Sequence, residues 1–279
     1  MNSALARIAV FVVGLAVVFA GGLAIGNAVG PDVEPAAGHG SGEHGSSGDH
    51  GRHGGEISLG LDRSRVAPGP DRRVTFRLLD GSGAALATYD QKHERDLHLV
   101  VVGTPGLTDY QHLHPTRDGD LWTARMALAP GRYRVYADGR TAGEDFVAAS
   151  TLTVTGRRTG DPRTPAPSTR DSIGPYDVAL DAADDGTVTL RVTRDGEPVT
   201  DLQPYLGASG HLVVIRRGSL DYLHAHPEDG PPGPEVAFAV EFDKPGVHRL
   251  FLDFKHDGRV RTAAFTVRIG GHGEVGHAH

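Results

Sequence analysis

The first stretch of the chain is strongly apolar. Residues 8–29 form a nearly unbroken apolar run that follows Arg7 and contains no charged side chain. A helix of that length covers the roughly 30 Å hydrocarbon layer of a membrane. We therefore predict that residues 1–30 are an N-terminal membrane anchor or a signal segment, with Arg7 on the cytoplasmic side. A buried core helix is disfavoured, because nothing polar marks a solvent-facing side.

Two histidine-containing stretches have too little apolar content to fold. Residues 31–55 are rich in Gly and Ser, and we predict a disordered tether there. Residues 271–279 have a similar composition and are predicted to be a disordered tail. Their histidines either bind metal ions loosely or are polar linker filler, and composition leaves both readings open.

From residue 56 onward, short apolar runs alternate with turn residues. Residues 74–79 alternate with period two, residues 97–102 are rich in β-branched side chains, and residues 131–136 follow a Pro-Gly turn. Closely spaced strands without a sustained helical period are typical of a β-sandwich. We predict a first β-sandwich module at residues 56–156.

The same pattern restarts after an Arg-, Thr- and Pro-rich stretch. We predict a linker at residues 157–172 and a second β-sandwich module at residues 173–270. The predicted fold class is all-β, with two tandem β-sandwich domains after an N-terminal transmembrane helix. The strands expected in the second module are residues 176–180, 187–192, 211–215, 236–242, 247–254 and 262–269.

Charge and composition narrow the chemistry. The 279 residues carry a net charge of -7, and their Lys and Arg residues form no basic stripe, so we expect no nucleic-acid partner. The chain has no Cys, which excludes disulfides, thiolate metal ligands and a cysteine nucleophile. Only 2 Met residues argue against a thioether site, whereas 16 His residues make imidazole the conspicuous functional group.

Histidines recur at matching places in the two modules. One strand carries His98 and is followed by a His-x-His-Pro segment, and this arrangement recurs from His211. In extended chain, residues two apart lie on the same face, so three imidazoles could converge in each copy. Duplication is the simplest account of the repeat. The candidate metal ligands are His93, His98, His112, His114, His211, His224, His226 and His256.

The fourth ligand differs between the two expected sites. His93 precedes the first copy's strand, whereas His256 lies on a late strand of the second module, which makes the second copy the better candidate. Asp96, Asp109 and Asp221 are near enough in sequence to orient an imidazole, although turn and cap roles are alternatives for them. A purely structural, hydrogen-bonded histidine cluster is the other interpretation of the repeat.

The segments "LHLVVVGTPGLTDYQHLHP" and "GHLVVIRRGSLDYLHAHP" resemble a group of actinobacterial secreted or membrane-anchored proteins with an HLHP motif. Those proteins are described as heavy-metal-binding or as uncharacterised. The resemblance covers roughly residues 90–270. It implies extracytoplasmic β-sandwich modules, similar in outline to cupredoxin-like or immunoglobulin-like domains, with a link to copper handling.

These observations lead to two functional expectations. The first is a single-pass cell-membrane protein, or a secreted one if its first segment is cleaved, with its bulk outside the cytoplasm. It would bind a divalent transition metal, copper first and zinc second, for buffering or delivery. The second is a cell-surface protein-interaction module whose histidines brace the fold. We expect no enzyme, a copper-dependent oxidase being the third alternative, and the sequence names no protein partner.

Overall fold

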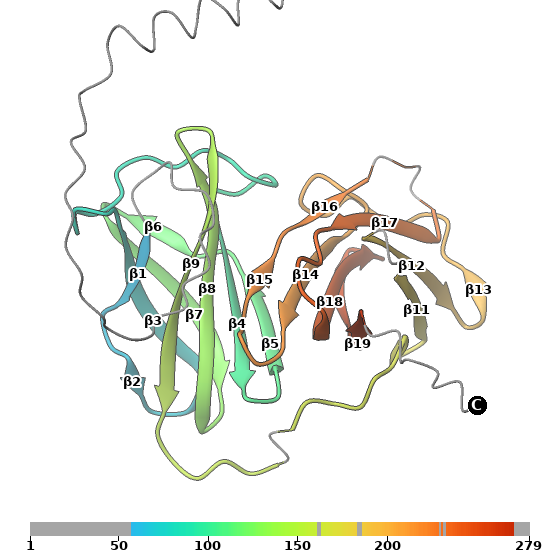
Figure 1. Cartoon of the computed structure of the whole chain (residues 1–279), viewed down its shortest axis with the longest axis horizontal. Helices are drawn as coiled ribbons and strands as arrows, with labels where there is room; N and C mark the ends of the chain where they lie inside the picture. Colours follow the sequence, from blue (N-terminus) through green and yellow to red (C-terminus); the bar gives the residue numbers. More distant parts are fainter. Residues whose placement is uncertain (1–56, 161–162, 183–185, 229, 231–232, 271–279) are drawn as a thin grey trace, which may run out of the picture. The chain divides into compact units, whose positions relative to one another are not determined.

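Every regular element among the described residues is a β-strand, which confirms the predicted all-β class (Figure 1). The computed structural model describes residues 57–160, 163–182, 186–228, 230 and 233–270, which belong to one compact unit. The predicted anchor, tether and tail lie outside the described residues. Within the part of the chain that is described, no helix is long and apolar enough to cross a membrane.

The first module, residues 57–156, consists of two sheets. Their strand order is that of the immunoglobulin sandwich, A-B-E-D on one sheet and A′-G-F-C-C′ on the other. The first sheet runs β1 (Ser58–Leu61), β3 (Gly69–Leu79), β7 (Leu121–Leu128) and β6 (Thr116–Asp118). The second runs β2 (Arg65–Val66), β9 (Glu144–Val154), β8 (Gly131–Thr141), β4 (Leu97–Thr104) and β5 (Thr108–Leu113).

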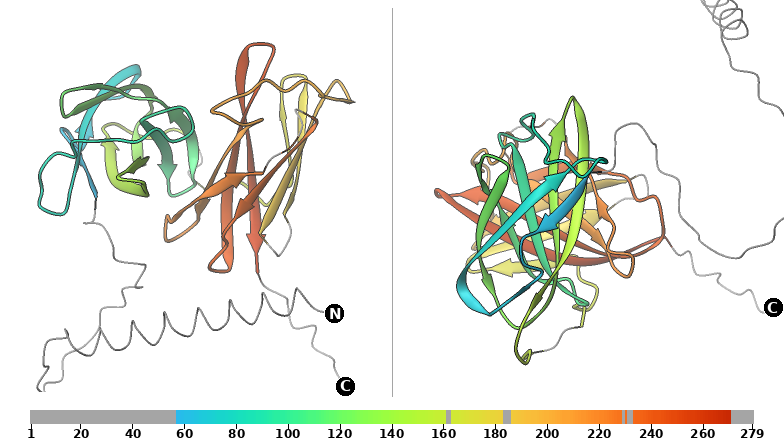
Figure 2. Two further views of the ribbon diagram at one scale, coloured as in Figure 1. Left: turned by 90° about the horizontal axis from the view of Figure 1, so that it is seen from above. Right: turned by 90° about the vertical axis from the view of Figure 1, so that its left-hand side faces the viewer.

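The second module repeats the orders A-B-E-D and G-F-C-C′, has an additional strand beside its A strand, and has no counterpart of β2 among its described strands. Figure 2 shows its long antiparallel hairpin of β18 and β19 at the red end of the colour scale. One sheet runs β10 (Arg170–Ile173), β11 (Tyr176–Ala182), β12 (Thr187–Arg194), β17 (Glu235–Val240) and β16 (Ala225–Pro227), with β13 (Glu197–Pro198) paired to β12. The other runs β15 (Tyr222–Leu223), β14 (His211–Arg216), β18 (Gly246–His256) and β19 (Arg259–Ile269).

Period-two alternation explains how each sandwich closes. In β7, the side chains of Trp122, Ala124, Met126 and Leu128 are buried while the residues between them are more exposed. Alternate side chains of a strand point to opposite faces, so this strand supplies one wall of the core. Burial of such apolar surface contributes about 25 cal/mol per Å².

A tyrosine fixes one corner of the first module. Tyr133, near the start of β8, donates a hydrogen bond from its hydroxyl to the carbonyl of Ala129 over 3.0 Å. This is the tyrosine corner of immunoglobulin-type sandwiches. His248 is at the equivalent place in β18, two residues after the Gly of its Pro-Gly turn, so the corner is not repeated in the second module.

Strands β4 and β14 are buried on both faces. Leu99 and Val101 point into the first module's core, whereas Val100 and Val102 pack in a cluster with Val213 and Ile215 of β14. We call this cluster the interface core. It joins the two modules, and its buried members are Val100, Val102, Leu107, Tyr136, Val213, Ile215 and Phe251.

Matching residues of the two modules make matching contacts across the interface core. Tyr110 donates a hydrogen bond to Asp253 over 3.0 Å, and its counterpart Tyr222 donates to Asp138 over 3.3 Å. Tyr110 also stacks on Phe251, with ring centroids 4.1 Å apart, as Tyr222 contacts Tyr136 at 5.3 Å. Reciprocal contacts of this kind characterise an isologous interface, so the modules pair about a local two-fold axis.

Candidate metal centre

The first copy of the repeat brings its three histidines together. His98, His112 and His114 each offer a ring nitrogen, and the three nitrogens lie within 4.8 Å of one another. The register explains this, because His112 on β5 pairs with Val100 on β4, two residues from His98, and His114 follows two residues later. The side chains therefore share the face that carries the interface core.

Hydrogen bonds orient two of these rings from behind. Nε2 of His98 lies 2.9 Å from the carbonyl oxygen of Lys92, and Nδ1 of His112 lies 2.9 Å from Oδ2 of Asp253. Both oxygens accept, so each of these ring nitrogens is the donor. Their other nitrogens, Nδ1 of His98 and Nε2 of His112, face each other across 3.0 Å.

Burial keeps the ring of His98 neutral. The side chain is fully buried, and burial, followed by the nearby ring of His112, lowers the pKa of His98 to about 3. Three hydrogen bonds along the path from Lys92 to Asp253 need three N–H protons, whereas two neutral imidazoles carry only two. With both outer bonds formed, the two rings have no N–H left to place between the facing nitrogens unless one further proton is bound.

His114 completes the group. Its Nε2 is buried and finds no hydrogen-bond partner among the described residues. Burial, followed by the rings of His112 and His98, lowers the pKa of His114 to about 3. A buried ring nitrogen without a partner is costly, and this one lies in a group of imidazoles.

Asp253 is the carboxylate that organises this site, and it belongs to the second module. It accepts hydrogen bonds from His112 and Tyr110 on Oδ2, and Thr262 donates to its Oδ1 over 2.5 Å. Its side chain is buried, with 3% exposed. Asp253 therefore presents a fixed acceptor to the first module's histidine.

The site's carboxylate was not among the three that the sequence suggested. Asp109 is paired with Arg158 at 2.8 Å, and Asp221 accepts from the Ser219 hydroxyl at 2.6 Å. Among the described residues, no hydrogen bond joins Asp96 to an imidazole. One signal was present, since Asp138 and Asp253 each follow the Gly of a Pro-Gly turn by seven residues.

His211 departs from its expected place. Instead of grouping with the second copy's histidines, its ring stacks on His98 at 5.3 Å and on His112 at 4.7 Å between centroids. Its Nε2 is buried and has no hydrogen-bond partner within the described chain. Burial, followed by the nearby rings of His112 and His98, keeps the pKa of His211 well below 6.5.

His93 also lies at this cluster. Its backbone adopts a left-handed φ of 48°, and its ring lies 6.0 Å from that of His98 and 5.5 Å from that of His211. Burial is the main cause that lowers the pKa of His93. The cluster around the first copy thus contains five imidazoles, of which His98, His112 and His114 hold ring nitrogens within mutual reach of one ion.

The second copy does not gather its histidines. His224 and His226 have ring centroids 6.4 Å apart, and no second group of three potential ligands meets within the described residues. His256 lies elsewhere, where Tyr176 contacts its Nδ1 at 2.8 Å and Asp201 its Nε2 at 3.0 Å. With both ring nitrogens engaged, His256 is not placed as a fourth ligand of this copy.

In the second copy, the aspartate that corresponds to Asp253 is Asp138, and it forms an ion pair with Lys92. Nζ of Lys92 lies 2.7 Å from Oδ1 of Asp138 and 3.3 Å from Oδ2 of Asp145. The Lys92 side chain is 7% exposed, so this is a buried pair. Asp138 is opposite His98 in the register of β4 and β8, as Asp253 is opposite His211 in β14 and β18.

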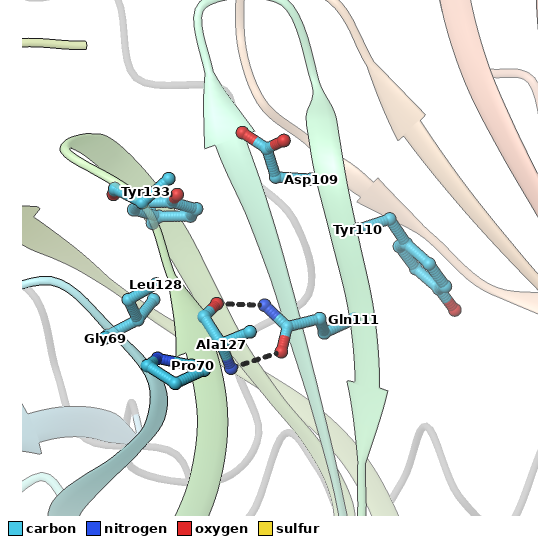
Figure 3. A pocket seen from close by; sticks show the side chains of 9 residues that line it. Gly69, Pro70, Asp109, Tyr110, Gln111, Ala127, Leu128 and Tyr133 are labelled. Atoms are coloured by element: carbon cyan, nitrogen blue, oxygen red, sulfur yellow. Dashed lines mark hydrogen bonds between the residues drawn. The ribbon is translucent and has the colours of Figure 1, made fainter. Parts of the chain in front are cut away.

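Gln111 helps to set the orientation of β5. Figure 3 shows its side chain reaching toward Ala127 while Tyr110 points to the other side of the strand. The amide donates to the Ala127 carbonyl over 2.8 Å and accepts from its N–H over 3.0 Å. Because these bonds hold Gln111 toward the other sheet, Tyr110 and His112 are directed to the interface.

A family model described as "Domain of unknown function (DUF8832)" matches residues 52–156 and 174–271. The two matched stretches correspond to the two modules. Among curated proteins, none matches the chain. The family description carries no activity, so the chemistry of the site has to be argued from its geometry.

Several solved structures are similar at low identity. A Salmonella alpha-2-macroglobulin mutant is 15% identical over 79% of this chain and 15% of its own, with a TM-score of 0.27. FdeC, an Escherichia coli adhesin, is 15% identical over 78% and 65%, with a TM-score of 0.25. Titin Ig tandem domains are 10% identical over 78% and 99%, with a TM-score of 0.21. The chain spans less than two thirds of the first two, and TM-scores this low carry no functional argument.

Proposed function

The chain belongs to the family described as Domain of unknown function (DUF8832), and we propose that this member binds a divalent transition metal ion through His98, His112 and His114. One observation carries the proposal. Two of the three rings are held by acceptors behind them, and their other nitrogens face each other across 3.0 Å beside His114. Metal-ligating histidines almost always have such an acceptor on the second nitrogen.

The spacing of one pair of ring nitrogens suits an ion after a small adjustment, whereas the nitrogen of His114, within 4.8 Å of the other two, has to move closer. Two nitrogens bound to zinc at about 2.0 to 2.1 Å in tetrahedral geometry lie roughly 3.3 Å apart. Nδ1 of His98 and Nε2 of His112 lie 3.0 Å apart, so they need to separate by only a few tenths of an ångström. A cation placed there replaces the repulsion of two lone pairs by two coordinate bonds.

The ligand set favours copper(II) first and zinc second. All three ligands are imidazoles, and the chain has no Cys. For a nitrogen site of this kind, affinity rises along the first-row series to copper and falls again at zinc. We infer that the protein buffers or delivers such an ion outside the cytoplasm, held at the membrane by residues 1–30.

Metal titration of the full chain tests the proposal. One tightly bound copper(II) or zinc ion is expected, with affinity lost in the double variant His112→Ala and His114→Ala. The matched control replaces His277 and His279, two imidazoles of the C-terminal tail, and is expected to keep the tight ion. If the ligand variant binds as tightly as the unaltered chain, the proposal is wrong.

A second candidate is a cell-surface interaction module in which the histidines brace the pair of sandwiches. The favouring observation is the continuous path from the Lys92 carbonyl through His98 and His112 to Asp253. A single proton shared by the two rings would complete all three hydrogen bonds and balance the charge of Asp253. If the histidines only brace the fold, a chelator leaves the thermal stability of the protein unchanged. If the protein binds a metal ion, removal of that ion by the chelator lowers its thermal stability.

A further inference from the structure

The two copies of the repeat carry different side chains at one position that precedes the first histidine of each copy. Lys92 lies six residues before His98, and Tyr205 lies six residues before His211. Both residues begin the same tight turn, closed by the bridges Lys92 to Arg95 and Tyr205 to Ala208. Lys92 and Tyr205 are therefore equivalent under the local two-fold relation of the modules.

Equivalence extends to the carboxylates that these residues approach. In the first copy, Asp253 accepts from Tyr110 and turns to His112. In the second copy, Oδ2 of Asp138 accepts from Tyr222 and Oδ1 binds the ammonium of Lys92 at 2.7 Å, and among the described residues no hydrogen bond joins Asp138 to His224. At the interface between the modules, Asp253 is thus bound to a histidine, whereas the equivalent Asp138 is bound to a lysine.

We propose that Lys92 is a built-in cation that closes a second metal site, formed by His211, His224 and His226 with Asp138 as the orienting carboxylate. The inference rests on the proposed function, since it assigns Lys92 the control of how many ions the protein holds. Two observations carry it: the Lys92 ammonium occupies Asp138, and buried Nε2 of His211 has no hydrogen-bond partner among the described residues.

Charge explains why the ammonium excludes a metal ion. The charges of Asp138 and Asp145 act on His224, and both carboxylates lie within 3.3 Å of Nζ of Lys92. A divalent cation beside that ammonium meets a like charge in a buried site, where screening by water is weak. It also loses Asp138 as the acceptor that would fix the ring of His224.

The first copy lacks such a competitor. Its equivalent position holds Tyr205, a neutral side chain whose ring lies 6.5 Å from that of His114. Burial raises the pKa of Tyr205 to about 12, so its hydroxyl remains protonated at neutral pH. Asp253 is left to orient His112, and one ion per chain is the result.

Native mass spectrometry of the full chain with zinc, after removal of weakly bound ions by a chelator, counts the tight sites. We expect one ion in the unaltered chain and none in His112→Ala, which loses the first site. Lys92→Tyr combined with His112→Ala is expected to bind one ion again, at the second site. Addition of His224→Ala to that double variant is expected to remove this ion. Tyrosine is chosen because it is the side chain at the equivalent position. Thermal unfolding of each variant reports whether it is folded.

The reciprocal change keeps the test decisive if Lys92 variants unfold. Tyr205→Lys places an ammonium beside Asp253 and is expected to lower zinc affinity at the first site by at least about tenfold, whereas Tyr205→Phe keeps the ion. This inference alone is overturned if the unaltered chain holds a single ion but a folded Lys92→Tyr variant with His112→Ala binds none. It is also overturned if Tyr205→Lys leaves zinc affinity at the first site unchanged. Two ions in the unaltered chain, one of them lost in His224→Ala, also overturn it. Absence of a tight ion from the unaltered chain overturns the proposed function itself.

Discussion

Oδ2 of Asp253, on a strand of the second module, lies 2.9 Å from Nδ1 of His112 on the first. The proposed ligand His112 and the carboxylate that orients it are 141 residues apart in the chain. The proposed site therefore depends on how the two sandwiches pair as well as on its own histidines. Each module alone lacks part of this arrangement.

Asp253→Asn removes the charge but keeps a side-chain oxygen near His112. We expect metal affinity to fall by roughly 10- to 100-fold, because the ring loses a charged acceptor that raises its basicity. Competition with a chelator of known affinity measures the change. Asp195→Asn makes the same replacement at an exposed aspartate and is expected to leave affinity unaltered. Equal affinity in both variants contradicts the role of Asp253.

The two tyrosines that cross the interface offer a matched pair of variants. Tyr110→Phe and Tyr222→Phe each remove one hydrogen bond to a buried carboxylate while keeping the ring contact. We expect each to lower the free energy of unfolding by about 1.5 to 3 kcal/mol, the range for hydrogen bonds to charged groups. Urea unfolding of the metal-free chain measures this. No loss in either variant would show that these bonds do not hold the modules together.

The strands and the first histidine group follow from local sequence rules. Period-two spacing predicts that His112 and His114 share a face, and the duplicated pattern correctly predicts strands at β4, β8, β14 and β18. The alternating strand β7 carried a clear pattern but was not singled out. Its existence follows from the same rule.

The remaining features depend on pairing that no local pattern encodes. β4 and β14 are continuous apolar runs, which is typical of strands buried on both faces, but such runs do not identify what covers the second face. The answer is the other module. As a result, His211 lies among the first copy's rings, Asp253 instead of a nearby aspartate orients His112, and Lys92 forms a buried ion pair with Asp138.

Stability of the metal-free protein is expected to depend on pH through its buried imidazoles. Burial lowers the pKa of His98 and His114 to about 3, whereas an exposed histidine titrates near 6.5. Below about pH 6.5 the unfolded chain binds protons that the folded chain excludes, so stability is full above that pH and is lost as pH falls toward 3. The slope is up to about 1.4 kcal/mol per pH unit for each group.

Urea unfolding at pH 7.5, 6.0 and 5.0 measures this dependence. His98→Gln removes one of the titrating groups and is expected to give a shallower decline than the unaltered chain. A free energy of unfolding that stays constant from pH 7.5 to 5.0 would contradict neutral, buried imidazoles in the folded state.

Phe251 connects the interface core to the second module's strand β18. Its ring stacks on Tyr110 with centroids 4.1 Å apart and is 2% exposed. Phe251→Ala leaves a cavity at this contact, and we expect a loss of about 3 to 5 kcal/mol in the free energy of unfolding. Val260→Ala, at a side chain that is 45% exposed, is the control with little expected change.

The single tryptophan makes the coupling between modules measurable. Trp122 is buried in the first module's core, so its fluorescence follows that module, whereas far-ultraviolet circular dichroism follows the strands of both. If the interface core joins the two modules into one cooperative unit, Phe251→Ala shifts both transitions together, although the substitution lies in the second module. If Phe251→Ala shifts the unfolding transition seen by circular dichroism but not the one seen by Trp122 fluorescence, the modules unfold separately. The site that spans them is then formed by docking of two independently folded modules.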